Sequence, residues 1–341
     1  MSRSDPWEPR VSVVIVNFQG LSLLKPCLES VFRQPYRNIE VLVVDNGSTD
    51  GSVEWVTAHY QRVVLICNRE NAGFARANNQ GTAAATGDVI ILLNNDTAVS
   101  DGWIPGLLNM LEQPGVMVVT SKVVTEGVPD RFYEMNGTIN YLGYNIMRHF
   151  RDLSQVFFAG GASLAFRKID IGVPFLPEYF LYHEDVFLSW RMRLAGFDVR
   201  MAQDSVVHHV GSASTGRQSS SFVTFYQERN RLLNALLLYD TLTLAKITPL
   251  IVLDFAAKCA ASLLLSRKSF TGILRAYLWP IVHVRWLCSQ RKALQGSRKV
   301  SDSQILSLMS SKLIDGDSSA ARVTNRVAAC YARATGLSSH G

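Results

Sequence analysis

The sequence predicts an α/β fold whose mostly parallel central sheet is flanked by helices. Three observations support this prediction. Strand-length apolar runs recur through the first half of the 341-residue chain, helix-length segments separate them, and polar, turn-forming residues follow several of the runs. Strands that are apolar on both faces are typical of a parallel sheet, because helices cover it on either side.

The individual elements follow this alternation along the chain. The strands expected are Val11–Asn17, Ile39–Val44, Val63–Cys67, Asp88–Leu93, Val116–Val124, Gln155–Phe166 and Val206–His209. The helices expected are Leu21–Phe32, Ser52–Tyr60, Gly73–Thr86, Trp103–Leu111, Glu184–Ala195 and Phe222–Leu238. Between them, residues 125–154 lose periodicity and are expected to form a long insertion.

The composition changes beyond residue 240. Residues 241–341 hold 14 basic residues against four acids, a balance of +10, whereas the residues before them hold 20 against 24. The basic character therefore concerns the partner of the tail and not a substrate. We expect a first domain over residues 1–240, an apolar and basic helical region over 241–290, and a Ser- and Arg-rich, partly disordered end over 291–341.

The helical region over 241–290 is expected to be amphipathic. Asp254, Lys258 and Ser262 are four residues apart in an otherwise apolar stretch, so they form one narrow polar stripe on a helix. The region lacks an uncharged span of about 18 residues, the length typical of a transmembrane helix. Its aromatic and cationic residues favour a helix that lies in the lipid interface. The alternative is a helical hairpin packed on the first domain or on a partner chain.

The overall composition indicates a globular protein of a reducing compartment. Apolar residues make up 48% of the chain and charged residues 18%. The five cysteines lie far apart without a C-x-x-C pair, which is not the pattern of a disulfide framework. The apolar run Val11–Val16 after the polar N-terminus is too short for a signal peptide, so a cytoplasmic location is expected.

The segment VLVVDNGSTDGS at residues 41–52 places a carboxylate where a strand ends. Ligands of open α/β sheets bind beyond the carboxyl ends of the strands. Asp45 could there accept the imide N–H of a uracil or thymine base. Alternatively, Asp45 belongs to an ordinary turn and accepts hydrogen bonds from local amides.

The segment DVIILLNNDTAV at residues 88–99 ends an apolar strand in three polar side chains. Mg²⁺ in proteins takes one or two carboxylates together with phosphate oxygens. Asp96 could therefore hold Mg²⁺ or Mn²⁺ against the two phosphates of a nucleotide-sugar, with Asn94 and Asn95 as weaker ligands. The alternative is that Asp96 or Thr97 caps a helix.

Two later segments carry acids and histidines. Glu184 and Asp185 begin the helix expected in YFLYHEDVFLSWRMRLAGFDV at residues 179–199. Asp185 could remove a proton from an acceptor hydroxyl, although acids also occur at helix N-termini because of the helix dipole. In VVHHVGSAST at residues 206–215, an imidazole could complete the coordination that Asp96 begins, or the histidines could be structural.

A final segment, FYQERNRLLN at residues 225–234, places Arg229, Asn230 and Arg231 on a helix. The guanidinium fork of arginine suits phosphate oxygens. The alternative is a solvated helix face, or salt bridges to the acidic first domain.

In their order and spacing, these motifs resemble those of glycosyltransferase family 2, especially its bacterial rhamnosyltransferase-like members. The resemblance covers about Val11 to Asp240. It is carried by VSVVIVNFQG, VVDNGSTDGS, NRENAGFARANNQG, LLNNDT, FAGGASLAFRK, YHEDVFLSWRMRLAGFDV and VVHHVGSAS. It implies the GT-A nucleotide-sugar-binding fold and an inverting enzyme that uses a nucleoside-diphosphate sugar.

The resemblance also implies roles for individual residues. Asp45 matches the carboxylate that faces the base, and Asp96 matches the metal-binding aspartate. Asp185 matches the catalytic base, with Glu184 beside it. His208 fits the late histidine of the family better than His209 does, and would join Asp96 as a metal ligand.

Further residues are implied to line the donor and acceptor sites. Gly160 and Gly161 match the small-residue stretch where the acceptor approaches. The run Asn94-Asn95-Asp96 departs from the pattern, since many relatives carry two or more carboxylates there. The residues implied to contact the donor are Asn17, Asp45, Asn71, Gly73, Phe74, Asn78, Asn94, Asn95, Asp96 and Arg229.

Together these features predict an inverting, metal-dependent glycosyltransferase bound peripherally at the cytoplasmic face of the inner membrane. On the resemblance alone, the donor expected first is dTDP-rhamnose, followed by UDP-galactofuranose or another UDP-sugar such as UDP-glucose. The acceptor expected is a hydroxyl of a glycan or polyprenyl-linked chain in the synthesis of cell-envelope polysaccharide. The number of subunits stays open, a homo-oligomer included.

Other functional classes fit the sequence less well. A nucleotidyltransferase usually has a basic, Gly-rich loop after its first strand, whereas residues 17–20 (NFQG) contain no cation. A non-catalytic nucleotide-sugar or glycan-binding protein would not need Asp185 at a helix start. A nucleic acid is not expected as a partner, because the basic tail also has wide apolar faces.

Overall fold

The computed structural model describes residues 7–125, 137–146, 154–209, 220–265, 267–314, 316 and 318–337. The chain forms two compact units. The first comprises Met1–Met135, Ala159–Phe180 and Arg200–Ser214, and the second comprises Asn136–Phe158, Leu181–Val199 and Thr215–Gly341. This division differs from the boundary predicted at residue 240, because residues 136–158, 181–199 and 215–240 belong to the second unit. Parts of the predicted insertion (126–136 and 147–153) and of the histidine motif (210–215) lie outside the described residues.

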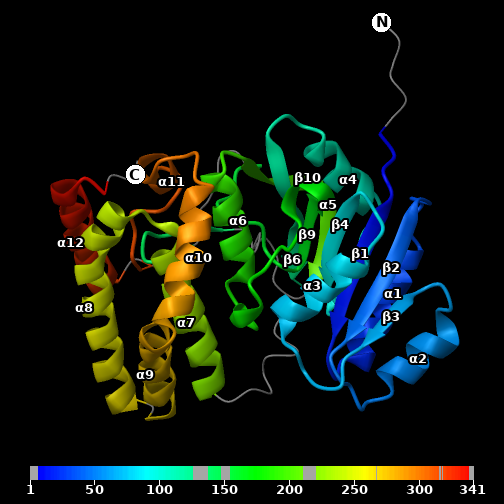
Figure 1. Cartoon of the computed structure of the whole chain (residues 1–341), viewed down its shortest axis with the longest axis horizontal. Coiled ribbons are helices and arrows are strands. Elements are labelled where there is room, and N and C mark those ends of the chain that lie inside the picture. Colours follow the sequence, from blue (N-terminus) through cyan, green and yellow to red (C-terminus); the bar gives the residue numbers. More distant parts are fainter. Residues whose placement is uncertain are drawn as a thin grey trace, which may run out of the picture. The chain divides into compact units, whose positions relative to one another are not determined.

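The first unit is built on an eight-stranded sheet in the order β3-β2-β1-β4-β9-β6-β10-β5 (Figure 1). Its strands are β1 (Val11–Asn17), β2 (Ile39–Asp45), β3 (Val64–Cys67), β4 (Val89–Asn94), β5 (Thr97–Val99), β6 (Val116–Thr125), β9 (Ser163–Arg167) and β10 (Asp198–His209, which enters this unit at Arg200). Its helices are α1 (Leu21–Phe32), α2 (Ser52–His59), α3 (Phe74–Ala84), α4 (Trp103–Leu111), α5 (Lys168–Ile171) and the short 3-10 helix η2 (Pro177–Tyr179).

The predicted parallel arrangement is confirmed for the four strands β3, β2, β1 and β4. In this half of the sheet Asn17 pairs with Asp45, and Val16 pairs with Asn94, so the carboxyl ends of three strands meet at one edge. Beyond β4 the sheet turns antiparallel, because β9 pairs antiparallel with both β4 and β6. The strand predicted over Gln155–Phe166 is shorter than expected and is limited to β9.

Helices cover both faces of the parallel half, as the apolar strands predicted. On one face, Val13 and Ile15 of β1 share a core with Leu24 of α1 and Trp103 of α4. On the other face, a Cβ atom at Gly81 of α3 would overlap Cγ1 of Val14. Glycine at this position therefore lets α3 pack directly on β1.

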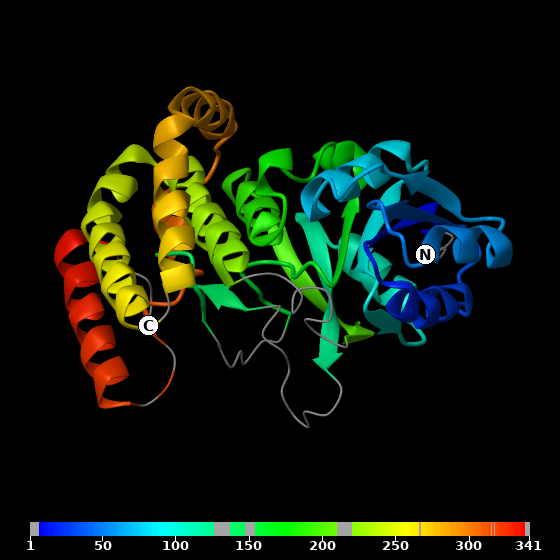
Figure 2. The ribbon, with the colours of Figure 1, turned by 90° about the horizontal axis from the view of Figure 1, so that it is seen from below.

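The second unit is mostly helical (Figure 2). A short hairpin of β7 (Thr138–Ile139) and β8 (Asn145–Ile146) comes from the predicted insertion. The helices are α6 (Glu184–Leu194), α7 (Ser220–Leu238), α8 (Thr241–Leu265), α9 (Arg267–Val282), α10 (Val284–Gly296), α11 (Asp302–Leu306) and α12 (Ser319–Thr335). Helix α7 packs against α6, α9 and α10, and α8 packs against α9. The end of the chain, expected to be partly disordered, thus contains α11, α12 and part of α10.

Helix α8 carries the predicted polar stripe. Oδ2 of Asp254 accepts a hydrogen bond of 3.0 Å from Nη2 of Arg231 on α7. Nζ of Lys258 donates to Oε1 of Glu228, which also lies on α7. Among the described residues, α8 is the one helix long and apolar enough to cross a membrane by length and composition alone, and 17% of its apolar window is buried. Its polar stripe is therefore used within the second unit, while most of its apolar surface stays exposed.

Candidate active site

Asp45 is held by its neighbours at the carboxyl end of β2. Nδ2 of Asn17, on the adjacent strand β1, donates to Oδ2 of Asp45 at 2.9 Å, and the backbone N–H of Ser48 donates to Oδ1 at 2.7 Å. The side chains of Asn17 and Asp45 are buried. Because each carboxylate oxygen can accept more than one hydrogen bond, the fixed carboxylate can also accept an N–H from a ligand.

The residues after β4 join this arrangement through Asn95. Nδ2 of Asn95 donates to Oδ1 of Asn17 at 2.8 Å, which makes a chain of hydrogen bonds from Asn95 through Asn17 to Asp45. A Cβ atom at Gly20 would overlap Nδ2 of Asn95 and lie 2.9 Å from Oδ1 of Asn17. Gln19 beside it has a φ of 52°, a left-handed conformation that is uncommon outside glycine. The turn after β1 is therefore shaped by contact with the amides of the site.

The segment of residues 71–78 is fixed by a glycine turn. Gly73 has a φ of 84°, its N–H donates to Oδ1 of Asn71 at 2.9 Å, and a Cβ atom there would overlap the ring of Phe180. Nδ2 of Asn46, next to Asp45, donates to the carbonyl of Gly73 at 3.4 Å. The segment is thereby connected to the turn that carries Asp45.

Two further residues of this segment lie on α3. Phe74 begins the helix, and its ring centroid lies 6.4 Å from that of Phe175. Asn78 is buried, and its Nδ2 donates to the carbonyl of Phe74 at 2.9 Å. The Asn78 amide therefore stabilises the first turn of α3.

Asp96 lies beside a histidine, but not beside the predicted one. Oδ1 of Asp96 is 3.1 Å from Nε2 of His209, and both side chains are buried. His208 is exposed, and its Nε2 lies 3.1 Å from Oγ of Ser100. Adjacent side chains of a strand point to opposite faces, so only one histidine of the pair can reach Asp96. The candidate metal ligand is therefore His209, which corrects the choice of His208.

The side chains at the end of β4 and the end of β10 fit a divalent cation that keeps most of its coordination sites for phosphate and water. Asp96 offers a carboxylate oxygen, His209 offers an imidazole nitrogen, and Oδ1 of Asn94 is buried without a hydrogen-bond partner among the described residues. Among the residues that the structure describes, no group of three or more His, Cys, Asp or Glu side chains could hold a metal by itself. This donor set suits a metal that binds together with the phosphates of a ligand.

The predicted acceptor glycines lie close to the end of β4. Gly160 and Gly161 precede β9, and the carbonyl of the next residue, Ala162, accepts the N–H of Asn94 at 3.0 Å. The first unit therefore brings these glycines to the same edge of the sheet as Asn94.

Glu184 and Asp185 begin α6 in the second unit, as predicted. The two residues before them, Tyr182 and His183, have φ values of 70° and 62°. Glu184 is buried, and its Oε2 has no hydrogen-bond partner among the described residues. Burial, followed by the negative charge of Asp185, raises the pKa of Glu184 to about 8. This shift favours the protonated form of Glu184, whose neighbour Asp185 is half-buried.

Arg229, implied as a donor contact, belongs to α7 of the second unit. It is buried, and its Nε donates to Oδ1 of Asn230 at 2.9 Å. Its guanidinium lies against the rings of Phe225, Tyr226 and Trp279. Its role toward a donor stays a prediction.

The first unit thus brings together most of the residues predicted for the donor, while Glu184, Asp185 and Arg229 belong to the second unit. The sequence did not single out Asn46, Gln19 or Gly20 of the first unit. A signal for Gly20 was present, because it is a glycine in the short turn between a strand and a helix. The amides of Asn46 and Gln19 gave no signal, since their partners are distant in the sequence.

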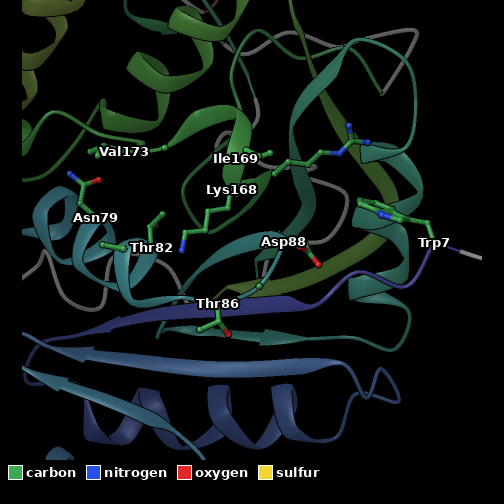
Figure 3. Close-up of a pocket in the computed structure, with 12 residues that line it drawn as sticks. Trp7, Asn79, Thr82, Thr86, Asp88, Lys168, Ile169 and Val173 are labelled. Atoms are coloured by element: carbon green, nitrogen blue, oxygen red, sulfur yellow. The ribbon is translucent and has the colours of Figure 1, made fainter.

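A separate cavity of about 710 Å³ lies in the first unit (Figure 3). Asp88, just before β4, lines it, so the cavity lies at the opposite edge of the sheet from Asn94. The two cations of its wall are bound by backbone carbonyls: Nη2 of Arg167 donates to Leu111, and Nζ of Lys168 donates to Ala85. No residue predicted for the active site lines this cavity.

Comparison with known proteins agrees with these observations. Residues 12–172 match the family model described as glycosyl transferase family 2. The chain is 32% identical over 112 residues to the glycosyltransferase GlyG of Streptococcus pneumoniae, a match that covers 32% of this chain and 37% of that protein. It is 28% identical over 211 residues to the glycosyltransferase AglE of Haloferax volcanii, covering 59% of this chain and 67% of that protein.

Solved structures show the same fold. The mannosyltransferase PcManGT of Pyrobaculum calidifontis, in complex with GDP-Man and Mn²⁺, has a TM-score of 0.50 at 18% identity and covers 97% of this chain and 84% of its own. Residues 1–349 of S. aureus TarS have a TM-score of 0.51 at 15% identity, covering 96% of this chain and 88% of that one. The mixed α/β architecture is therefore that of GT-A transferases.

Proposed function

We propose that this chain, whose residues 12–172 match the model of glycosyl transferase family 2, is an inverting transferase that moves one sugar from a nucleoside-diphosphate donor to an acceptor hydroxyl. The observation that carries the proposal is the gathering of polar side chains after β1, β2 and β4. Asn17, Asp45 and Asn95 form one hydrogen-bonded chain there, and Asp96 adjoins His209. Such an edge of an α/β sheet is where nucleotides bind.

The donor is expected to bind with its base at Asp45. Asn17 and Ser48 orient the carboxylate, so that Asp45 can accept the imide N–H of thymine or uracil without moving. We expect dTDP-rhamnose as the donor, with UDP-galactofuranose or another UDP-sugar as the alternative. The choice of rhamnose rests on the likeness of the motifs to rhamnosyltransferase-like members of the family.

Asp96 and His209, with Asn94 beside them, are the residues that would hold Mg²⁺ or Mn²⁺. A bound divalent cation neutralises charge that develops on the departing diphosphate. The protein residues in this region keep the carboxylate of Asp96 buried and oriented by the imidazole of His209.

Asp185 is the proposed base. It takes the proton of the acceptor hydroxyl while the hydroxyl oxygen forms a bond to the anomeric carbon. The bond from that carbon to the diphosphate oxygen breaks on the opposite face, and the diphosphate leaves with the electron pair. This single displacement inverts the configuration of the anomeric carbon. Burial and the charge of Asp185 raise the pKa of Glu184 and so favour its neutral form, which limits the negative charge beside Asp185.

The acceptor is expected to be a glycan or polyprenyl-linked chain at the cytoplasmic face of the inner membrane. The exposed apolar residues of α8 to α10 and the positive balance of the tail support this location. Apolar faces insert at the lipid interface, and cations are attracted to anionic headgroups.

A donor screen on the purified chain tests the proposal. Thermal stabilisation and donor hydrolysis would be followed with Mg²⁺ or Mn²⁺ for dTDP-rhamnose, UDP-galactofuranose, UDP-glucose, UDP-N-acetylglucosamine and GDP-mannose. We expect selective, metal-dependent stabilisation by one dTDP- or UDP-sugar. A folded chain that responds to none of the donors, and to no free nucleotide, would contradict the proposal and favour a non-catalytic protein.

A further inference from the structure

We propose that Asn230 and Asn234 of α7 are positioning residues for the acidic pair at the start of α6, and that Arg229 orients Asn230. The inference rests on the proposed function, because it concerns the residues that would activate the acceptor. It is argued from contacts within the second unit alone.

The turn before α6 has a conformation that its own residues disfavour. Tyr182 and His183 have φ values of 70° and 62°, and together with Gln19 and Phe180 they are the non-glycine residues with positive φ among those described. Such a backbone is disfavoured by a side chain with a Cβ atom. It persists only where surrounding groups hold it, so the contacts of this turn decide where Glu184 begins α6.

Asn230 binds the turn through its amide. Nδ2 donates to the carbonyl of Leu181 at 2.8 Å and to the carbonyl of Tyr182 at 2.7 Å. The asparagine is fully buried, so water does not compete for these bonds. One side chain therefore uses both of its N–H groups on two consecutive peptides of the strained turn.

Asn234 lies one helical turn further along α7 and continues the contact. Its Nδ2 donates to the carbonyl of His183 at 3.3 Å. The same carbonyl accepts the N–H of Phe187, which closes the first turn of α6 at 2.9 Å. The two asparagines thus hold three consecutive carbonyls that lead directly into Glu184.

Arg229 determines which way the Asn230 amide points. Nδ2 of Asn230 can face both carbonyls only when Oδ1 points away from them, and Oδ1 accepts Nε–H of Arg229 at 2.9 Å. The guanidinium lies 5.0, 4.6 and 5.1 Å from the ring centroids of Phe225, Tyr226 and Trp279. Cation–π contacts of this kind hold the guanidinium in place.

The functional consequence is a change in turnover and not in donor binding. A displacement of about 1 Å in a catalytic group can lower the rate roughly 100-fold. Except for Arg229, the residues predicted to contact the donor belong to the first unit, and none of them binds the turn before α6 in the described part of the chain. Loss of the asparagine contacts should therefore lower kcat and leave the donor KM nearly unchanged.

The test compares Asn230→Ala and Asn230→Asp with the control Asn325→Ala in the full chain. Asn325 makes the same kind of contact elsewhere in the second unit, since Nδ2 donates to the carbonyl of Ile314 at 2.8 Å and Oδ1 accepts the N–H of Leu313 at 2.8 Å. We expect kcat to fall roughly 10- to 100-fold in both Asn230 variants, with the donor KM within about twofold. The control should keep its kcat. Equal kcat in all three variants would overturn the inference, and so would a loss confined to the donor KM.

A rescue variant separates positioning from a general loss of packing. Glycine adopts positive φ without strain, so His183→Gly should restore part of the kcat of Asn230→Ala. A double variant that is no faster than Asn230→Ala would contradict the positioning role. If Asn230→Ala does not fold, Asn234→Ala removes only the longer contact and is measured in the same way.

Amide hydrogen exchange keeps the inference distinct from the proposed function. Residues 181–188 should exchange faster in Asn230→Ala than in the unmodified chain or in Asn325→Ala. If the unmodified chain transfers no sugar, the proposed function fails, yet faster exchange of this segment still supports the contact. Unchanged exchange of the segment would overturn the inference whatever the activity.

Discussion

Nε2 of His209 lies 3.1 Å from Oδ1 of Asp96, and both side chains are more than nine-tenths buried. The contact follows from the pairing of β10 with β5, in which His209 is opposite Thr97, the residue after Asp96. His208, one residue earlier, is opposite Ala98 and points away. The two adjacent histidines therefore have different environments, and they form a matched pair for experiment.

We expect His209→Ala to lower the affinity of the protein for the metal, and His208→Ala to leave this affinity unchanged. Loss of the imidazole removes one candidate ligand and the group that orients Asp96. A decrease of roughly 10- to 100-fold in metal affinity is typical of such losses. The measurement is Mn²⁺ titration of thermal stabilisation in the presence of saturating nucleotide. A larger loss in His208→Ala than in His209→Ala would show that the assignment is wrong.

The parallel half of the fold could be predicted from the sequence, because its signals are local. Each strand predicted from an apolar run between Val11 and Leu93 ends at or near the end of the observed strand. The turn residues after β2 and β4 mark the edge of the sheet where Asp45 and Asp96 lie. Hydrophobic runs and turn residues depend on short stretches of chain. The family resemblance named the same edge.

The remainder depends on relationships that no short stretch encodes. The choice between His208 and His209 depends on strand register, and a shift of one residue exchanges the two faces. Asn230 contacts the turn before α6, although the residues of that turn precede it in the sequence by 48 and 49 positions. The change to antiparallel pairing at β9 is likewise a tertiary feature, which alternation of strands and helices does not reveal.

We expect Gly20→Ala to weaken nucleotide binding. The new methyl group would overlap Nδ2 of Asn95 and approach Oδ1 of Asn17, so the hydrogen bond between these amides would break. Loss of one buried hydrogen bond of the site is worth about 1–1.5 kcal/mol, or roughly a tenfold rise in the Kd of the nucleotide. The measurement is calorimetric titration with UDP or dTDP.

Gly296→Ala is the control for this prediction, since a Cβ atom at Gly296 meets nothing within 4 Å. The control should keep the nucleotide affinity of the unmodified chain. Equal affinities for Gly20→Ala and the unmodified chain would show that the Asn17–Asn95 contact does not shape the nucleotide site.

We expect Asp185→Asn to abolish transfer and to spare donor binding. The amide keeps the size of the side chain but cannot take up the acceptor proton. General-base catalysis contributes about 10²- to 10⁴-fold, so kcat should fall by at least that lower limit. The measurement combines transfer assays with thermal stabilisation by the donor. Full turnover in this variant would contradict the assignment of the base.

The pH dependence of stability should reveal the state of Glu184. Its pKa is raised from the ordinary 4.5 to about 8, first by burial and then by the charge of Asp185. Between these pH values the folded chain binds a proton that the unfolded chain has lost, so this group favours folding below pH 4.5 and loses that contribution as pH rises through 8. We expect Glu184→Gln to flatten the decrease of the unfolding free energy between pH 5 and pH 8.

The measurement is urea unfolding of both proteins at several pH values across that window. Glu178→Gln serves as the control, because Glu178 is an acid of η2 in the first unit, outside the candidate site. A change of slope that appears in Glu184→Gln and not in this control would identify Glu184 as its source. Parallel slopes for Glu184→Gln and the unmodified chain would mean that Glu184 is ionised in the folded protein.

The tail offers a last prediction, on membrane binding. Ile281 and Val282 at the end of α9 are 69% and 76% exposed, and Arg285 follows them on α10. Apolar side chains beside cations are typical of helices at an anionic lipid surface. We expect Ile281→Asp combined with Val282→Asp to reduce binding to phosphatidylglycerol vesicles, measured by sedimentation, because two charges replace two inserting side chains.

The control is Ile169→Asp in the first unit, which changes an apolar residue that is 92% exposed. This variant should bind vesicles like the unmodified chain. If the double variant binds as well as Ile169→Asp does, the end of α9 does not contact lipid, and the positive balance of the tail must serve another partner.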